Sequence, residues 1–329
     1  MKDYRILKPR FLVAAILLLA CIAAFLGAAW RARALLNAAL DGRRERPLAR
    51  AQTTEFTLLA EMRKEQAMTR VGGWLSVVYP ERTTIRTQRG MLYAEVYTPI
   101  GGETDGAPWA LVVHGGLGTS GAQMQDVACE LSLAGYNVLL PDLYGHGQSD
   151  GDVSTLGLAD AQDVRACVDW ILGREPNAQI ALIGQDEGAV AVLLAAGEGL
   201  AGAVKIAVLD SVYLNAKERV AGLLAETGAG GAVDEMLLDV ALRTALGIDL
   251  SDVNILESAA KSEIPLLFIH GTLDSEAPAY HSEDAAAAAN GGELLLVEGA
   301  AHGMARYVNP DAYYGAVLTL LEKNIDNAE

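Results

Sequence analysis

The sequence predicts an α/β fold in which a mainly parallel sheet is covered by helices on both faces. After Pro80, short apolar segments of strand length alternate with longer helix-forming segments. One apolar run, 180–183, passes through a glycine-flanked turn directly into an alanine-rich helical segment, 190–197. Polar or glycine-rich motifs follow several predicted strands, and functional groups in parallel sheets gather at these carboxyl ends. These features indicate one large α/β domain with a site at the carboxyl edge of its sheet.

The composition is that of an acidic globular protein. A chain of 329 residues, 51% of them apolar, is long enough to bury one large core. Its 25 Lys and Arg residues against 42 Asp and Glu residues give a net charge of -17. Such a charge disfavours a surface for nucleic acid, so we expect no nucleic-acid partner.

Residues 1–31 are predicted to be a membrane anchor. Basic residues precede an uncharged run, 11–30, which as a helix would cross the roughly 30 Å of hydrocarbon in a bilayer. The other interpretations are a cleaved signal peptide, with small residues at 27–29, and a lipoprotein signal that ends at Cys21. The run is long for a signal peptide, and apolar residues continue after Cys21, so we expect a single-pass protein of the cell membrane. Arginines also follow the run, and they leave its orientation open.

Residues 32–80 are predicted to form a membrane-proximal helical linker. The segment is charged and has a helical pattern without a clear strand, as in 56–63. We expect this linker to pack loosely on the domain that follows. The pattern changes after Pro80, and the α/β domain is expected over 81–329.

The elements of the domain follow from the apolar periodicity. Segments 83–87 and 92–97 alternate like antiparallel strands around a turn at Arg89 and Gly90. Further strands are expected at 109–113, 137–140, 179–183, 203–209, 265–269 and 293–297. Helices are expected at 123–133, 157–172, 186–196, 277–289 and 310–324.

The segment around Asp186 has the outline of a nucleophile elbow. The flanking Gly184 and Gly188 allow strand and helix to approach closely, so the side chain between them leaves the turn at the carboxyl edge of the sheet. Serine is the usual residue there, whereas this chain has Asp186. A simpler interpretation is that Asp186 caps the helix that follows, with its carboxylate accepting backbone N–H bonds.

An acid and a histidine follow two later strands. Asp274 lies in the loop after 265–269, and His302 lies in the loop after 293–297. A carboxylate and an imidazole on successive loops can meet above the elbow, with Asp274 orienting His302 as a base. Each residue alone also fits an ordinary loop. The order nucleophile, acid and histidine at successive strand ends favours the catalytic interpretation.

Two other loops carry glycine-rich motifs. The turn 114–118, His-Gly-Gly-Leu-Gly, can direct backbone N–H groups at a developing oxyanion, although it is also compatible with an ordinary tight turn. The loop 142–151 contains His146 and Ser149, which we interpret as structural residues.

No metal, cofactor or disulfide is expected. The 5 histidines are scattered, and no close His or Cys spacing indicates ligands. Cys129 and Cys167 fall on separate predicted helices that would pack on opposite faces of the sheet, so they are not expected to pair.

With these motifs in order, the chain resembles the α/β-hydrolase superfamily, and within it the membrane-anchored bacterial branch of serine aminopeptidase-like and lipase-like hydrolases. The resemblance extends from about residue 83 to residue 321. It implies the α/β-hydrolase fold and a small helical cap over about 212–262, with helices at 216–225 and 233–246. It also implies the site residues: Asp186 at the nucleophile position, Asp274 as the acid, His302 as the base, and the backbone N–H groups of Gly116 and Glu187 as the oxyanion hole.

The departure from that branch is Asp186 itself. A carboxylate that attacks an ester would have to form an anhydride and expel an alkoxide, so ordinary esterase or peptidase chemistry is disfavoured. Aspartate does act at this position in the haloalkane dehalogenases and epoxide hydrolases of the same fold, where it attacks a saturated carbon. The dehalogenases have tryptophan after the aspartate, and here the charge of Glu187 would repel a leaving halide. Epoxide opening uses a pair of cap tyrosines, and Tyr213 is the only tyrosine in the predicted cap region.

We therefore predict a membrane-anchored hydrolase that acts on a small, largely apolar substrate. Asp186 would be the nucleophile, His302 the base that activates water, and Asp274 its orienting partner. The alternative is an inactive hydrolase scaffold, in which aspartate has replaced the nucleophile and the protein serves as a membrane-tethered binding or regulatory protein.

Overall fold

One eight-stranded sheet organises the protein, with the strand order β1-β2-β4-β3-β5-β6-β7-β8. The computed structural model describes residues 9–43, 55–101, 106–200, 202–250 and 254–325. Its strands are β1 Glu81–Arg86, β2 Met91–Tyr97, β3 Trp109–Val113, β4 Asn137–Pro141, β5 Ile180–Gln185, β6 Val204–Asp210, β7 Leu266–Gly271 and β8 Glu293–Val297. Strand β2 runs antiparallel to both of its neighbours, and the pairs from β4 to β8 are all parallel. The predicted mainly parallel sheet is confirmed.

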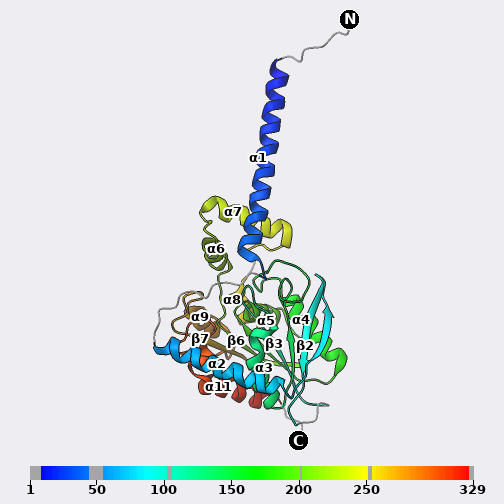
Figure 1. The fold of residues 1–329 in the computed structure, drawn as a ribbon, viewed down its shortest axis with the longest axis vertical. Coiled ribbons are helices and arrows are strands. Elements are labelled where there is room, and N and C mark those ends of the chain that lie inside the picture. Colours follow the sequence, from blue (N-terminus) through cyan, green and yellow to red (C-terminus); the bar gives the residue numbers. More distant parts are fainter. Residues whose placement is uncertain (1–8, 44–54, 102–105, 201, 251–253, 326–329) are drawn as a thin grey trace.

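Helices cover the sheet on both faces (Figure 1). The helices of the domain are α3 Gln125–Leu133, α4 Ala161–Arg174, α5 Glu187–Gly197, α6 Ala216–Glu226, α7 Ala232–Ala241, α8 Ile255–Lys261, α9 Tyr280–Ala288, α10 Ala305–Val308 and α11 Pro310–Asn324. They are preceded by α1 Pro9–Leu40 and α2 Glu55–Leu75. Short turns of other helix types are η1 Gly121–Met124 and η2 Leu242–Leu246.

Two apolar cores lie on the two faces of the sheet. Strand β3 shows the division, because Trp109, Leu111 and Val113 join one core, and Ala110 and Val112 join the other. The first core contains side chains of α4, α5, α8 and α9, and the second contains those of α2, α3, α10 and α11. Both faces are buried, which explains why the strands read as continuous apolar runs.

The two cysteines of the domain lie on these opposite faces. Cys129 on α3 belongs to one core and Cys167 on α4 to the other, and both are free thiols. The prediction that Cys129 and Cys167 lie on opposite faces of the sheet is therefore confirmed.

Helix α1 extends beyond the predicted anchor. Its apolar part rises away from the domain (Figure 1), and the described residues contain one helix, Ile16–Leu40, that is long and apolar enough to cross a membrane. The helix does not stop at residue 31. Leu35, Leu36 and Leu40 are fully buried in the core of the domain.

The expectation of a loosely packed linker over 32–80 is wrong for the parts that the structure describes. The end of α1 is buried, and α2 lies against α3 and α10 with Ala60, Val71 and Trp74 buried. Charged residues on the exposed faces of both helices mask this packing in the sequence. Residues 44–54 lie outside the described part of the chain.

The predicted cap forms above the carboxyl edge of the sheet. Helix α6 and the continuous segment of α7 and η2 occupy the ranges expected for its two helices. Helix α8, which was not predicted, packs against α5 and belongs to the layer that covers the sheet. The side chain of Asn254 caps the N-terminus of α8 by accepting the N–H of Glu257. The helix is so short that its sequence shows little apolar periodicity, which is why it was not predicted.

Close backbone approach at the elbow gives a test of the fold. A Cβ atom at Gly188 would lie 2.4 Å from the carbonyl oxygen of His114, so we expect Gly188→Ala to destabilise the protein by about 3 kcal/mol. Gly222 in α6 is the matched control, because it lies in a helix with open space around it. Gly222→Ala should raise the free energy of unfolding by about 0.5–1 kcal/mol. Urea unfolding of the detergent-solubilised chain, followed by circular dichroism, measures both; equal effects would contradict the packing described here.

Candidate active site

Asp186 occupies a strained turn between β5 and α5. Its backbone has φ 49° and ψ −113°, a conformation that costs a non-glycine residue about 1–3 kcal/mol. Glycines make the turn possible: a Cβ atom at Gly184 would lie 2.5 Å from the carbonyl oxygen of Gly188, and one at Gly115 would lie 1.9 Å from that of Gln185. The turn therefore has the geometry predicted for a nucleophile elbow, with aspartate at its apex.

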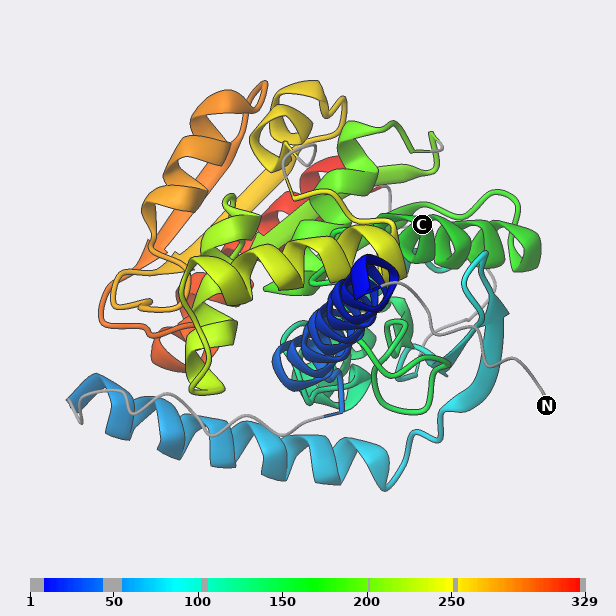
Figure 2. The ribbon, with the colours of Figure 1, turned by 90° about the horizontal axis from the view of Figure 1, so that it is seen from above.

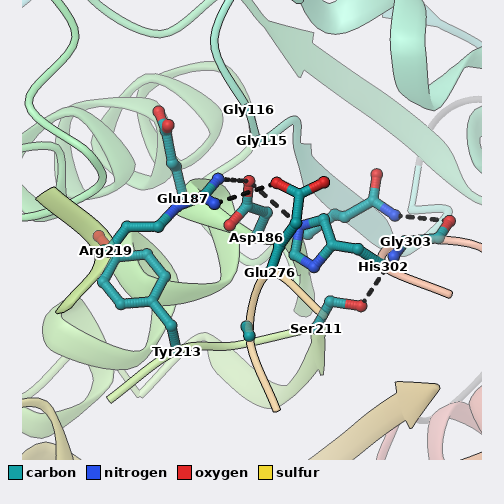
Figure 3. A network of polar contacts seen from close by, with 12 residues as sticks. Gly115, Gly116, Asp186, Glu187, Ser211, Tyr213, Arg219, Glu276, His302 and Gly303 are labelled. Atoms are coloured by element: carbon teal, nitrogen blue, oxygen red, sulfur yellow. Dashed lines mark hydrogen bonds and ion pairs between the residues drawn. The ribbon is translucent and has the colours of Figure 1, made fainter. Parts of the chain in front are cut away.

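The structure brings the three predicted side chains together at the carboxyl edge of the sheet. Figure 3 shows two of them, Asp186 and His302. His302 Nε2 lies 3.3 Å from Asp186 Oδ2, and His302 Nδ1 lies 2.7 Å from Asp274 Oδ2. The second oxygen of Asp274 accepts the N–H groups of Glu276 and Ala277, each at 2.9 Å. These bonds hold the carboxylate so that it orients the imidazole.

The loop that carries His302 is held by two residues that were not singled out in the sequence. Ser211 Oγ accepts the N–H of Gly303 at 3.1 Å, and Gln185 Nε2 donates to the carbonyl oxygen of Gly303 at 3.1 Å. Ser211 directly follows the buried strand β6, and Gln185 is the last residue of the buried strand β5. Their position directly after β6 and at the end of β5 is the sequence signal that could have identified them as positioning residues.

The predicted oxyanion turn lies against the elbow. Gly116 has φ 86°, and a Cβ atom there would lie 3.5 Å from Asp186 Oδ2. His114 supports the turn: its Nε2 accepts the N–H of Leu143, so its Nδ1 carries the proton that faces Thr119 Oγ1 at 2.9 Å. The other expected donor, the N–H of Glu187, is at the first turn of α5, where N–H groups lack partners within the helix.

Arg219 from the cap completes the site and was missed in the sequence. Its Nη2 lies 3.0 Å from Asp186 Oδ2, and its Nη1 lies 3.1 Å from Glu276 Oε2 (Figure 3). Only 5% of its side chain is exposed. The sequence did contain an indication of this role. Arg219 lies on the same face of α6 as the apolar residues Ala216, Val220 and Leu223, and a charged side chain on such a buried face needs a buried partner.

Three comparisons with known proteins agree with this architecture. A family model described as serine aminopeptidase, S33, matches residues 107–230. The esterase Pf2001 of Pyrococcus furiosus has a similar structure, with a TM-score of 0.61 and 20% sequence identity over 86% of this chain and 100% of that chain. This chain is an α/β-hydrolase-fold protein.

Other relatives extend the likeness. Est1E of Butyrivibrio proteoclasticus, solved with ferulic acid bound, superimposes with a TM-score of 0.59 and 19% identity over 73% of this chain and 100% of that chain. The uncharacterized protein YfhR of Escherichia coli O157:H7 is 30% identical over 172 residues, which are 52% of this chain and 54% of YfhR. The uncharacterized protein YqkD of Bacillus subtilis is 28% identical over 198 residues, 59% of this chain and 65% of YqkD. The chain thus spans between half and two thirds of the length of YfhR and of YqkD.

The charges of the candidate site depend on Asp186. Burial alone would lower the pKa of His302, but the carboxylates of Asp186 and Asp274 raise it well above its ordinary value, so the imidazole carries a proton at neutral pH. The folded protein holds this proton more tightly than the unfolded chain. The interaction therefore stabilises the fold fully below the ordinary pKa of about 6.5, and this stabilisation is lost as the pH rises through the raised pKa.

The carboxyl group of Glu187 is largely uncharged, whereas the sequence led us to expect a negative charge there. Burial, together with the neighbouring Asp186 carboxylate, raises its pKa to about 8, so it is largely neutral at pH 7. Its Oε2 accepts a hydrogen bond from Ser154 Oγ at 2.8 Å, and its side chain points away from His302 (Figure 3). The expectation that Glu187 would repel a leaving halide is corrected, because a largely protonated carboxyl exerts little repulsion.

The loop histidine and serine expected to be structural lie in buried hydrogen-bonded positions. His146 Nδ1 lies 3.2 Å from the carbonyl oxygen of Tyr144, and Ser149 Oγ donates to the carbonyl oxygen of Asp142 at 2.7 Å. Within the described ranges, no group of three or more His, Cys, Asp or Glu side chains is arranged to hold a metal ion.

The protonation of His302 can be read by NMR. In Asp186→Asn, the pKa of His302 should fall toward its ordinary value, because the carboxylate that lies 3.3 Å from its Nε2 is gone. Glu187→Gln is the matched control, since it replaces an adjacent carboxyl that is largely neutral. Titration of ¹³C-histidine-labelled protein, with His302 assigned from a His302→Gln variant, gives both values. The same His302 pKa in wild type and Asp186→Asn would contradict the ion pair.

Proposed function

We propose that this protein is a membrane-anchored hydrolase in which Asp186 attacks a saturated carbon of a small, largely apolar substrate and displaces an anionic leaving group. The single observation that carries the proposal is the position of one carboxylate oxygen, Asp186 Oδ2, 3.3 Å from His302 Nε2 and 3.0 Å from Arg219 Nη2. The family match and the hydrolase neighbours support hydrolysis in general. The apolar length of α1 supports the anchor.

In the first step, a carboxylate oxygen of Asp186 forms a bond to the carbon, and the bond from that carbon to the leaving group breaks. The leaving group departs with the electron pair as an anion. Asp186 becomes a neutral ester, so Arg219 loses one of its two carboxylate partners at the moment when the anion forms. The guanidinium is then free to bind this anion, and the largely neutral Glu187 does not oppose it.

In the second step, water hydrolyses the ester. Esterification removes one of the two anions that hold the proton on His302, so the pKa of the imidazole falls, the ring releases its proton to solvent water, and the neutral ring becomes a base. It takes a proton from water, and the hydroxide attacks the carbonyl carbon of the ester. The N–H groups of Gly116 and Glu187 would stabilise the oxyanion. The alcohol leaves with a proton from His302, and the carboxyl proton that remains on Asp186 then passes to the imidazole, which restores both the carboxylate and the imidazolium.

The backbone conformation of Asp186 in the elbow favours an active site over an inactive scaffold. A conformation that costs about 1–3 kcal/mol persists where function or surrounding packing requires it. Asp186 keeps this conformation together with an oriented imidazole and an adjacent glycine turn. In the described conformation Asp186 is only 3% exposed and lies under Arg219, so substrate entry requires α6 to move.

A single turnover in ¹⁸O-labelled water tests the covalent step. Excess enzyme is mixed with members of haloalkane, epoxide and alkyl ester panels, and the elbow peptide is analysed by mass spectrometry. The label should enter the carboxylate of Asp186, while the first alcohol released carries unlabelled oxygen from Asp186. His302→Gln should accumulate the ester, and Asp186→Asn should not form it. Label in the alcohol during the first turnover would overturn the mechanism.

The second candidate is an inactive scaffold, and the buried ion pair between Asp186 and Arg219 favours it. A carboxylate shared by two cations is a weak nucleophile unless the cap opens. If the scaffold interpretation holds, the wild type turns over no member of the three panels. Asp186→Ser would then gain esterase activity, because serine restores the usual nucleophile beside His302. Asp186→Ala is the control for hydrolysis that does not depend on the elbow.

A further inference from the structure

Helix α7 of the cap crosses beside α1. Figures 1 and 2 show α7 roughly perpendicular to α1, on the side of the domain from which α1 rises. Arg31 joins the two helices through both oxygens of Asp234, with Nε to Oδ1 at 3.1 Å and Nη2 to Oδ2 at 2.8 Å. Because Arg31 follows the exposed apolar part of α1 directly, this ion pair places the start of α7 at the level where that apolar part ends.

The outer face of α7 is apolar and exposed. Val233, Met236 and Val240 are 66%, 58% and 47% exposed, and their spacing of three and four residues places them on one side of the helix. The inner side, with Leu238 and Ala241, is buried against the protein. Exposure of a row of large apolar side chains to water is unfavourable, which indicates that another apolar medium covers this face.

Of the three acidic residues of α7, Asp234 and Asp239 are paired, and the exposed Glu235 lies about 100° or more around the helix from the apolar row. Asp234 is bound by Arg31, and Asp239 accepts a hydrogen bond from Arg243 Nε at 3.0 Å. Trp30, 73% exposed, lies at the end of the apolar part of α1, and tryptophan is enriched where acyl chains meet lipid headgroups. The adjacent Arg31 and Arg33 suit the headgroup region. The end of the apolar part of α1 and the outer face of α7 thus lie at the same level, and both are exposed and apolar.

We propose that α7 is an interfacial helix that lies on the bilayer crossed by α1, with Val233, Met236 and Val240 inserted among the outer acyl carbons. The inference rests on the proposed membrane anchor. An amphipathic helix in the membrane plane buries its apolar face about 5–10 Å into this region, and α7 has the required direction because it is roughly perpendicular to α1.

The position of α7 connects the bilayer to the site. Helix α7 follows α6 through a short segment that contains Gly228, Gly230 and Gly231, all with positive φ, and α1 packs against both helices. Helix α6 carries Arg219, which covers Asp186. The cap is therefore a membrane-bound cap, and its substrate is an amphiphile that partitions into the bilayer and enters from the lipid side.

Lipid quenching in reconstituted full-length protein tests the proposal. Met236→Cys in a Cys21→Ser background is labelled with bimane and placed in vesicles of phosphatidylcholine and phosphatidylglycerol that contain doxyl-labelled phosphatidylcholine. Cys129 and Cys167 are buried and should not react. The matched control is Leu133→Cys, because Leu133 is 51% exposed and ends α3 at the opposite edge of the sheet, before β4. We expect at least a two-fold loss of fluorescence at position 236 and none at position 133.

The native Cys21 separates this proposal from the anchor. Cys21 is exposed in the apolar part of α1, so bimane on Cys21 of the wild-type chain reports the anchor alone. Quenching at Cys21 without quenching at position 236 overturns the interfacial helix and leaves the anchor intact. A label at position 236 that neither doxyl lipid nor aqueous iodide quenches indicates a second copy on this face, and this also overturns the proposal. No quenching at Cys21 contradicts the anchor itself.

Discussion

The buried carboxylate of Asp186 is the interaction on which the rest of the site depends. A charge removed from water is costly unless partners compensate it, and here the partners are the guanidinium of Arg219 and the imidazole of His302. Arg219 comes from α6 of the cap and His302 from the loop after β8. Because both contact Asp186 Oδ2, this oxygen atom links the cap to the loops at the carboxyl edge of the sheet. Removal of one partner of such a buried pair typically costs about 3–5 kcal/mol, because the other charge is left buried without compensation.

In the proposed mechanism, the same arrangement makes the chemistry depend on charge. Each cation near Asp186 is held in its present state by the negative charge of that carboxylate. Removal of this charge by esterification would free Arg219 to bind an anion and lower the pKa of His302, so both groups would acquire their roles only after the first bond has formed. The largely neutral Glu187 behind the elbow prevents a further negative charge from opposing this change.

The cap also links the site to the N-terminal helix. The end of α1 is part of the core of the domain, with Leu36 and Leu40 fully buried. The ion pair between Arg31 and Asp234 fixes α7 to the same helix. Any movement of the cap that exposes Asp186 must therefore occur against α1, and the surroundings of α1 can influence how readily the site opens.

Local sequence patterns were sufficient to predict the order of the elements and the positions of the candidate site residues along the chain. Strands β3 and β8 and helix α11 have the predicted bounds, and the elbow, acid and histidine were found because strand periodicity, glycine spacing and loop position are local properties. Only the tertiary structure decided that α1 continues into the core, that Arg219 closes over Asp186, and that Glu187 is largely neutral. Burial and the distance between charges arise from segments far apart in the chain, so no local pattern contains them.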